Sequence, residues 1–299
     1  MRCACGSRAC EGFVSSICYL DGEFLPLAEA RVSPLDRGFL FGDGAYEVIP
    51  VYSGRPFRLD EHLVRLGNTL AALKLPDPHA FDEWRRIVRE VATRNPWSDQ
   101  SIYLQVSRGP DEMRNHAFPK VTRPTVFLMS EELLTPSAAQ RAEGVGAISA
   151  ADFRWLRCDL KTVSLLANCL LKQKAVEAGC METILLRDGF LTEGASSSIF
   201  IVRNGMLLAP PKSHLMLPGI TYDVILELAQ EHAMPHEVRE ILEDELRSAD
   251  EIWMSSSTKE ILPITRLDDR PVGDGRPGPF AQRMYACYQD FKNTVMRGE

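Results

Sequence analysis

The hydrophobic pattern of this chain breaks at residues 133–137, and the break constrains the fold more than any other feature. In Leu133-Leu134-Thr135-Pro136-Ser137 the regular spacing of apolar residues lapses, and the proline forbids a simple continuation of a helix. With 299 residues the chain is long enough for two modest domains. We therefore predict an N-terminal domain over 1–132, a linker over 133–137 and a C-terminal domain over 138–299.

Both predicted domains mix strands and helices without strict alternation. In the first, the patterns predict strands over 12–20, 45–52, 101–107 and 124–129, and helices over 60–75 and 80–94. In the second, they predict strands over 146–151, 182–186, 198–202 and 251–255, and helices over 163–179, 220–232 and 279–296. The fold class is therefore α+β, with helices on a sheet in the first domain and a barrel-like sheet in the second.

Composition and charge exclude several classes of function. The net charge is −7 and there is no run of Lys and Arg, so nothing indicates binding to nucleic acid or to an anionic membrane. No apolar stretch has the length of a membrane span, and the start of the chain lacks the apolar segment of a signal peptide. We expect a cytoplasmic protein whose partners are small molecules or a second copy of the chain.

The cysteines are irregularly spaced and do not suggest a disulfide framework. Eight cysteines in a chain without secretory features are expected to be reduced thiols. Three of them, Cys3, Cys5 and Cys10, cluster near the N-terminus, but no fourth Cys or His lies nearby at zinc-binding spacing. We expect no metal site.

Lys161 is the lysine best suited to form an imine. The chain has only 8 lysines against 26 arginines. We expect six of the others to be solvent-exposed because they lie in helical patterns or beside prolines: Lys74, Lys120, Lys172, Lys174, Lys212 and Lys292. Lys161 lies between Trp155-Leu156 and an apolar run that starts at Val163, which favours partial burial and a neutral amine. Taken alone, a lysine that opens a helix is more often structural.

Other segments supply groups that a phosphate-bearing ring cofactor would need. Glu193 follows a predicted strand and a turn, where a carboxylate could hold a ring nitrogen protonated, although a turn carboxylate is the plainer interpretation. Gly219-Ile220-Thr221 opens a predicted helix and offers backbone amides to a phosphate, but a helix cap explains it equally well. The hydroxyls of 255–258 and the guanidinium of Arg65 could add further contacts, or be a polar turn and a solvated helix face.

In this order, the segments resemble the class IV, or fold type IV, aminotransferases, which are pyridoxal-phosphate enzymes. The resemblance runs from about Asp36 to Thr265 and rests on five motifs: RGFLFGDGAYE at 37–47, EHLVRL at 61–66, RWLRCDLK at 154–161, TEGASSS at 192–198 and LPGIT at 217–221. It implies a two-domain fold, with a smaller N-terminal α/β sandwich and a larger barrel-like C-terminal domain.

The resemblance also implies roles for individual residues. Lys161 would be the Schiff-base lysine and proton shuttle, and Glu193 the partner of the pyridine nitrogen. Leu217 would pack against the ring of pyridoxal 5′-phosphate. The remaining cofactor contacts would come from Arg65, Gly219, Ile220, Thr221, Ser256 and Ser257. The resemblance further implies a homodimer.

The loop after residue 107 gives the clearest indication of the substrate. Its Arg114-Asn115-His116 resembles the carboxylate trap of the D-amino acid aminotransferases, in which Arg114, His116 and the hydroxyl of Tyr46 would hold the α-carboxylate. Outside the family context, Arg114 and His116 would be an ordinary polar loop. The resemblance therefore implies ping-pong transamination between a D-amino acid such as D-alanine and a 2-oxo acid such as 2-oxoglutarate, giving pyruvate and D-glutamate.

Other functions remain open on the same scaffold. These are a branched-chain L-amino acid aminotransferase, an (R)-amine transaminase and an aminodeoxychorismate lyase, and Arg114 and His116 argue against each because they favour a D-oriented carboxylate. A non-catalytic binding protein of the same fold is a further alternative.

Overall fold

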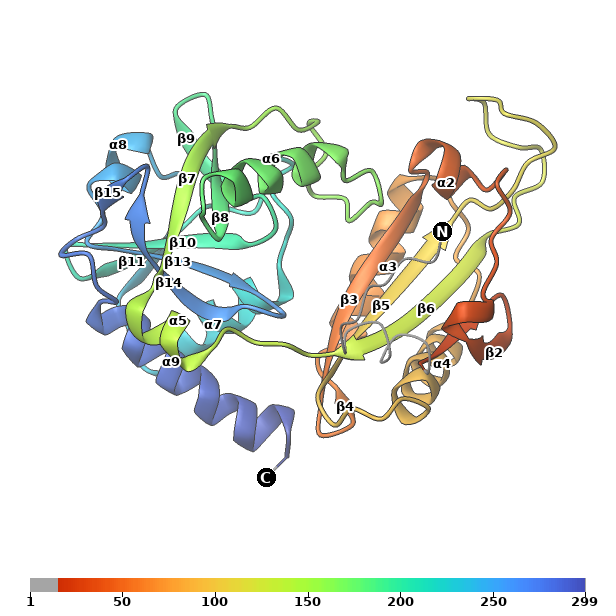
Figure 1. The fold of residues 1–299 in the computed structure, drawn as a ribbon, viewed down its shortest axis with the longest axis horizontal. Helices are drawn as coiled ribbons and strands as arrows, with labels where there is room; N and C mark the ends of the chain where they lie inside the picture. Colours follow the sequence, from red (N-terminus) through yellow and green to blue (C-terminus); the bar gives the residue numbers. More distant parts are fainter. Residues whose placement is uncertain (1–15, 299) are drawn as a thin grey trace, which may run out of the picture. The chain divides into compact units, whose positions relative to one another are not determined.

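The computed structural model describes residues 16–298, which divide into two compact units (Figure 1). The first unit contains the described chain up to Leu133 together with Lys161–Ser164, and the second contains 134–160 and the described chain from Leu165 onward. From the sequence we placed residues 161–164 in the second domain. Their return to the first unit means that Lys161 belongs to a different unit from the residues that directly precede it in the chain.

The first unit is built on a fully antiparallel sheet. Its strands run in the order β2-β1-β6-β5-β3-β4. They are β1 (Ile17–Leu20), β2 (Glu23–Pro26), β3 (Gly44–Tyr52), β4 (Arg55–Pro56), β5 (Gln100–Ser107) and β6 (Thr125–Glu132). The sheet agrees with the predicted strands, but β2 and β4 are too short to give a periodic signal in the sequence.

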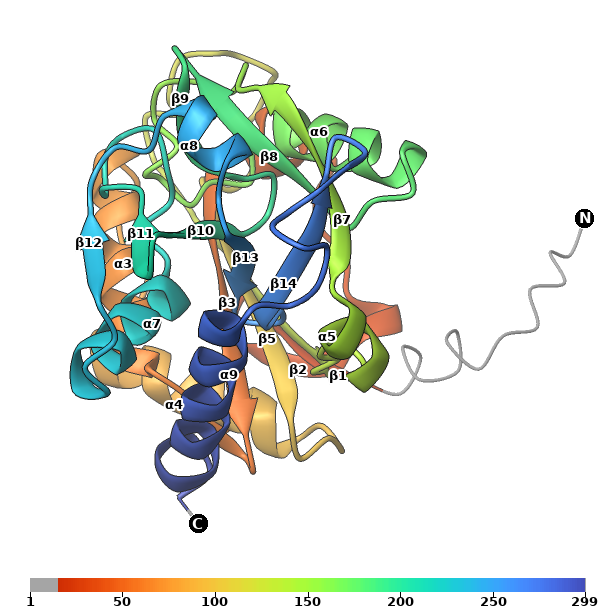
Figure 2. The ribbon, with the colours of Figure 1, turned by 90° about the vertical axis from the view of Figure 1, so that its left-hand side faces the viewer.

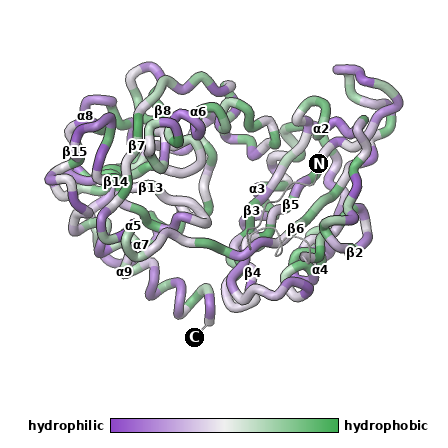
Figure 3. Tube along the Cα trace, in the orientation of Figure 1, coloured by the Kyte–Doolittle hydropathy of each residue, from purple (hydrophilic) through white to green (hydrophobic). Residues whose placement is uncertain are grey.

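Two helices, α3 (Leu59–Ala72) and α4 (Phe81–Thr93), cover one face of this sheet (Figures 1 and 2). Alternate strand residues such as Ile49, Ile102 and Leu104 are buried against leucines of α3 and against Trp84 of α4. The opposite face of α4 carries charged residues, so hydrophilic and hydrophobic positions alternate along it (Figure 3). The unit also contains a 3-10 turn, η1 (Leu27–Glu29), and a short helix, α2 (Arg37–Phe41).

The second unit is built on a mixed nine-stranded sheet that curves into a half-barrel. Its order is β12-β11-β10-β13-β14-β7-β8-β9, and β15 pairs with β14. The strands are β7 (Val145–Ala151), β8 (Glu182–Arg187), β9 (Phe190–Gly194), β10 (Ser198–Arg203), β11 (Met206–Ala209), β12 (His236–Val238), β13 (Glu251–Ser256), β14 (Glu260–Leu267) and β15 (Arg270–Pro271). This architecture confirms the predicted fold class.

Five α-helices and a π-helical segment accompany this sheet among the described residues. They are α5 (Ala138–Glu143), α6 (Leu166–Glu177), α7 (Ile220–Glu231), α8 (Glu243–Arg247), α9 (Pro279–Phe291) and the π-helix η2 (Lys292–Met296). The sequence predicted α6, α7 and α9. The short helices α5 and α8 were missed, since neither is long enough to show a helical period.

The start of α6 corrects the prediction of a helix that begins at Val163. The chain before Leu165 contacts the start of β3 and the end of α2 instead: Val163 N–H donates to the carbonyl of Gly44 at 3.0 Å, and the Ser164 hydroxyl donates to the carbonyl of Gly42, the C-cap of α2, at 2.9 Å. These contacts hold residues 163 and 164 outside the helix, which begins only at Leu166.

Two predictions of exposed lysines are also wrong. Lys292 is buried and donates to Oε1 of Glu260 at 2.7 Å, and Lys172 donates to the carbonyl of Met181. In both cases a partner distant in the sequence satisfies the ammonium group, which local patterns do not reveal.

Among residues 16–298, no helix has the length and apolarity needed to cross a membrane. The five cysteines in this range are free thiols, as predicted, whereas Cys3, Cys5 and Cys10 lie outside the described residues. Within the described part of the chain, no group of three or more His, Cys, Asp or Glu side chains could hold a metal ion.

Candidate active site

Lys161 lies in an extended segment on the edge of the first unit's sheet. Its carbonyl accepts the N–H of Tyr46 at 2.9 Å, and its own N–H lies 3.4 Å from the hydroxyl of Thr69 in α3. Its side chain is half-buried, as the sequence predicted. Backbone pairing with β3 therefore fixes the position from which the amine extends.

The structure brings Lys161 and Tyr46 together. The amine nitrogen lies 4.0 Å from the centroid of the Tyr46 ring, which is itself 5.6 Å from the ring of Tyr103. An ammonium over an aromatic face is attracted by the ring's negative face. Tyr46, assigned from the sequence to the substrate, therefore also contacts the lysine.

Next to Tyr46 in β3, a buried carboxylate, Glu47, holds Arg65. Glu47 is fully buried and accepts hydrogen bonds from Nε and Nη2 of Arg65 at 2.8 and 2.7 Å. Its second oxygen also lies 2.7 Å from Nδ1 of His62. The two-point contact fixes the plane and direction of the Arg65 guanidinium. Arg65 is therefore not part of a solvated helix face.

The charges within this cluster follow from its burial. Burial alone would raise the pKa of Glu47, but Arg65 and His62 lower it to about 2. Burial lowers the pKa of His62, against the opposing effect of Glu47. A neutral ring that donates from Nδ1 to Glu47 leaves a lone pair on Nε2, and this buried atom has no hydrogen-bond partner in the structure.

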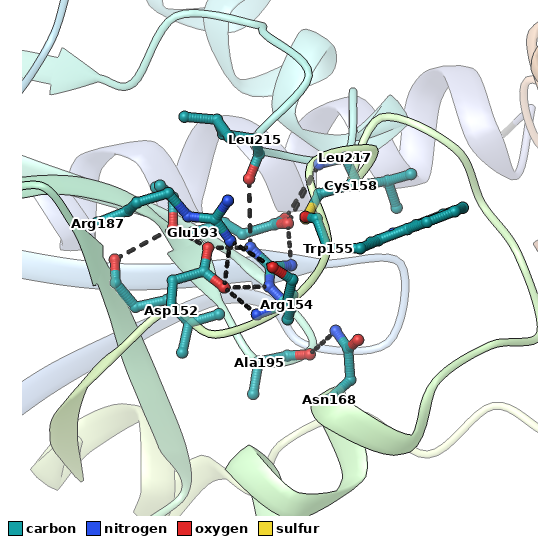
Figure 4. Close-up of polar contacts among 12 residues, drawn as sticks. Asp152, Arg154, Trp155, Cys158, Asn168, Arg187, Glu193, Ala195, Leu215 and Leu217 are labelled. Atoms are coloured by element: carbon teal, nitrogen blue, oxygen red, sulfur yellow. Dashed lines mark hydrogen bonds and ion pairs between the residues drawn. The ribbon is translucent and has the colours of Figure 1, made fainter.

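In the second unit, Glu193 lies one residue before the end of β9 and is buried. Its Oε1 accepts Nη1 of Arg154 at 2.5 Å, and the backbone N–H of Leu217 points to both carboxylate oxygens at 3.2 and 3.3 Å (Figure 4). The predicted location at a strand end is confirmed, and Leu217 joins Glu193 through its backbone.

Arg154 links Glu193 to a second buried carboxylate. Nε and Nη2 of Arg154 each donate to Asp152 at 2.9 Å, and Arg187 pairs with Asp152 at 3.0 Å. Burial raises the pKa of Asp152, but the two arginines bring it below its usual range. Arg154 is therefore held in place from the side opposite Glu193.

For the pKa of Glu193, burial has a larger effect than the neighbouring hydrogen-bond donors. It raises the pKa of this carboxyl to about 7, although Arg154 and the Leu217 amide act in the opposite direction. A carboxyl with such a pKa can share a proton with a basic ring nitrogen near neutral pH. The side chain therefore suits a protonated pyridine.

The first turn of α7 forms a candidate phosphate cradle in the same unit. Gly219 is the N-cap of this helix and no side chain caps it. A Cβ at Gly219 would lie 3.1 Å from the hydroxyl of Ser198, whose strand position is opposite Ser255. The Ser255 hydroxyl is buried and has no partner in the structure. Uncapped amides beside an unpaired hydroxyl are suited to bind an anion.

The predicted cofactor residues of this unit occupy two places. Ile220 and Thr221 form the first turn of α7, and Ser256 and Ser257 follow Ser255 at the end of β13. Ser256 is engaged locally, since its hydroxyl accepts the backbone N–H of Lys259 at 3.2 Å. The sequence indicated Ser255 only as one of the hydroxyls at 255–258, and the resemblance gave it no role of its own.

The loop that carries Arg114 and His116 belongs to the first unit. Both Arg114 and His116 are exposed and pack on Phe41 of α2: the Arg114 guanidinium carbon is 5.0 Å from the ring centroid, and the His116 ring is 5.3 Å from it. The two side chains therefore share one aromatic support.

These groups fit pyridoxal 5′-phosphate. Glu193 would offer a buried carboxyl of raised pKa to the ring nitrogen, and the α7 cradle would offer amides and a hydroxyl to the phosphate. The comparisons with known proteins identify the family. Residues 44–267 match the model of the amino-transferases of class IV. The chain belongs to this family. Its cofactor is pyridoxal 5′-phosphate.

The chain is also similar to individual curated proteins. It is 37% identical over 270 residues to a D-alanine aminotransferase of Bacillus licheniformis, covering 90% of this chain and 95% of that protein. It is 35% identical over 274 residues to a D-alanine aminotransferase of Staphylococcus aureus (strain MW2), covering 91% and 96%.

The chain is also similar to solved structures of enzymes that are named for a different substrate class. The branched-chain aminotransferase from the archaeon Thermoproteus uzoniensis with norvaline has a TM-score of 0.83 and 26% identity, with 95% of each chain covered. The branched-chain amino acid aminotransferase from Escherichia coli has a TM-score of 0.84 and 25% identity, again with 95% of each chain covered. The fold is therefore common to enzymes with different substrates.

Sequence reasoning gave no role to three residues that organise these groups. Glu47 was part of a motif, but its partner Arg65 lies 18 positions away. Arg154 and Arg37 likewise stand in motifs that gave them no role, and Arg37 lies in a five-residue helix without a periodic signal. A buried charge needs a partner, and that requirement is the signal that could have drawn attention to them.

Proposed function

We propose that this chain is a D-amino acid aminotransferase. It transfers the amino group of a D-amino acid, D-alanine foremost, to a 2-oxo acid such as 2-oxoglutarate, so that pyruvate and D-glutamate are formed in two half-reactions. The observation that carries this proposal is that Arg114 and His116 both pack on the ring of Phe41. An arginine fork with a neighbouring imidazole is suited to grip a carboxylate. The named relatives support the same substrate class.

We assign the chemical steps to this chain's own residues. The bound pyridoxal phosphate supplies an electron sink for the electrons left when Cα loses its proton. Lys161 would hold the cofactor covalently through its amine, and as a free amine it would carry the proton away from Cα and return it. Glu193 keeps the ring nitrogen protonated, and Leu217 packs against the ring.

The remaining residues bind and orient. Arg65, with its direction fixed by Glu47, binds the phosphate together with the first turn of α7. The other phosphate contacts come from Gly219, Ile220, Thr221, Ser256 and Ser257. Tyr46, Arg114 and His116 hold the substrate carboxylate. We also propose that the enzyme works as a homodimer in the cytoplasm; light scattering of the purified holoenzyme tests the dimer.

A substrate panel tests the function. Purified holoenzyme is assayed with D- and L-amino acids against 2-oxoglutarate, and we expect D-alanine to be turned over well and L-leucine poorly. The branched-chain enzymes among the solved relatives make the opposite preference the second candidate. Good turnover of L-leucine without D-alanine would show the D-specific assignment to be wrong.

A trapping experiment tests the lysine independently of the substrate. Borohydride should attach the cofactor permanently to the peptide that contains Lys161, which mass spectrometry detects. Lys161→Ala should give no labelled peptide, whereas Lys259→Ala, which changes another partly buried lysine, should keep the label. Labelling of a different lysine in the wild type would contradict the assignment.

A further inference from the structure

The loop that carries Arg114 and His116 is closed at its base. Gly109 has a φ of +80°, and a Cβ there would meet the carbonyl oxygen of Arg123 at 1.7 Å, so the two ends of the loop touch through their backbones. Just outside this contact, buried Asp36 accepts hydroxyl hydrogen bonds from Ser107 at 2.9 Å and from Thr125 at 2.7 Å. The loop therefore begins and ends at one fixed place.

The middle of the loop is held by a single side chain, Arg37 of α2. Nη1 of Arg37 donates to the carbonyls of Asn115 and Ala117 at 2.5 and 3.2 Å, and Nη2 donates to the carbonyl of His116 at 3.2 Å. Three consecutive carbonyls thus converge on one guanidinium. Because backbone groups are the acceptors, these bonds constrain the path of the chain at His116 and directly after Arg114.

Arg37 is itself immobilised from two directions. It is buried, and its Nε donates to Oδ2 of Asp43 at 2.8 Å. Asp43 also accepts two hydrogen bonds from buried Arg108, at 2.8 and 3.0 Å. Burial raises the pKa of Asp43, but the two arginines bring it below the usual range, so it is charged at neutral pH.

Aromatic rings complete the support. The Arg37 guanidinium carbon lies 4.8 Å from the ring centroid of Phe41 and 5.9 Å from that of Phe118, a residue of the loop itself. The Phe118 ring also lies 3.7 Å from the Arg108 guanidinium carbon. Phe41 is the ring on which Arg114 and His116 pack, so the same cluster fixes both the backbone and the side chains of the loop.

We propose that Arg37 is a positioning residue for substrate recognition: it holds the Arg114–His116 loop in the conformation that receives the substrate carboxylate. This inference rests on the proposed function of that loop. Lysine cannot replace Arg37, since its ammonium group is a point donor that cannot reach three carbonyls and Asp43 in one plane. Arg114 and His116 are exposed, so the stiffness of the loop has to come from such supports.

Arg37→Lys tests this, with Arg31→Lys as the matched control. Arg31 also donates to two backbone carbonyls of the first unit, those of Ala28 and Ala30, but it is exposed and has no described contact with the loop. For Arg37→Lys we expect the KM for D-alanine to rise by roughly ten- to a hundredfold with kcat within about threefold of the wild type. Arg31→Lys should leave both unchanged.

Limited proteolysis supplies a readout that does not depend on turnover. Trypsin should cut after Arg114 and Lys120 faster in the Arg37→Lys holoenzyme than in the wild type. A loop that Arg37 no longer holds can adopt the extended conformation that the protease binds. A raised KM with unchanged cleavage overturns positioning by Arg37. Faster cleavage with an unchanged KM also overturns the inference, because the loop position then has no effect on substrate binding.

Two further measurements keep the test decisive. If Arg37→Lys does not fold, Phe118→Ala removes the ring that packs on Arg37 and Arg108 but no charge, and Phe118 is itself exposed. It should raise the KM and the cleavage rate in the same direction. If the wild type uses L-leucine and not D-alanine, the proposed function has failed. The KM for L-leucine of Arg37→Lys is then compared with that of the wild type to test whether Arg37 positions the loop.

Discussion

Replacing Glu47 with glutamine should destabilise the first unit by an amount that its pKa predicts. The substitution keeps the shape of the side chain but removes the negative charge that faces Arg65 and His62. The fall of the Glu47 pKa from 4.5 to about 2 corresponds to roughly 3 kcal/mol in favour of the charged form at neutral pH. Breaking a buried ion pair costs roughly 3–5 kcal/mol, a similar magnitude.

The pH dependence has a definite sign. A carboxyl whose pKa is lower in the folded state contributes stability above its unfolded pKa, and this contribution is lost as the pH falls. The advantage of the wild type over Glu47→Gln should therefore be complete above about pH 5 and shrink as the pH falls from 4.5 toward 2.

Urea denaturation followed by circular dichroism measures the difference. Cofactor-free wild type and Glu47→Gln are compared at pH 7 and at about pH 4, at equal protein concentration. Glu61→Gln is the matched control. Glu61 lies on α3, the helix that carries His62 and Arg65, and it pairs with Arg58 at the surface. Its replacement should change the free energy of unfolding by no more than about 1 kcal/mol. A loss below about 1 kcal/mol for Glu47→Gln, or one that is equal at both pH values, would refute the reasoning.

Other substitutions test the second unit. Because burial raises the folded-state pKa of Glu193 from 4.5 to about 7, this carboxyl makes the cofactor-free protein less stable as the pH rises across that range; Glu193→Gln should flatten this decline, as urea midpoints at about pH 5 and pH 8 would show. Gly219→Ala should weaken cofactor binding by about tenfold in dialysis, since the new Cβ lies 3.1 Å from the Ser198 hydroxyl. Gly67→Ala meets no atom within 4 Å and should leave cofactor binding unchanged. Arg154→Met should lower cofactor affinity in the same dialysis assay by more than Gly219→Ala does, because Glu193 loses the side chain that donates to its carboxylate.

The sequence predicts most of the long elements of this fold and misses the short ones, but it also misses the eight-residue strand β14. Helix α3 and strand β3 were predicted to within a few residues, because α3 has a helical apolar period over fourteen residues and β3 is a run of apolar residues rich in β-formers. Helix α2 has five residues and strand β4 has two, which is too few for any period to emerge. The late start of α6 depended on contacts between Ser164 and Gly42, which are distant in the sequence.

The site shows the same division. Lys161 and Glu193 could be singled out because a motif placed each beside an apolar segment. Their immediate partners could not, since the pairing of Glu193 with Arg154 depends on how β9 and the segment after β7 pack. Electrostatic partners are set by tertiary structure, and a linear pattern contains no record of them.

The membership of residues 161–164 in the first unit limits how this protein can be divided. The chain passes from one unit to the other three times, and the second and third passages flank a segment of four residues that carries Lys161. A fragment that ends at Leu133 would leave the start of β3 without its partner segment and would contain no Lys161. Neither unit is therefore a single continuous piece of sequence that could be exchanged between relatives. A chimera of two family members has to take residues 161–164 from the same parent as β3.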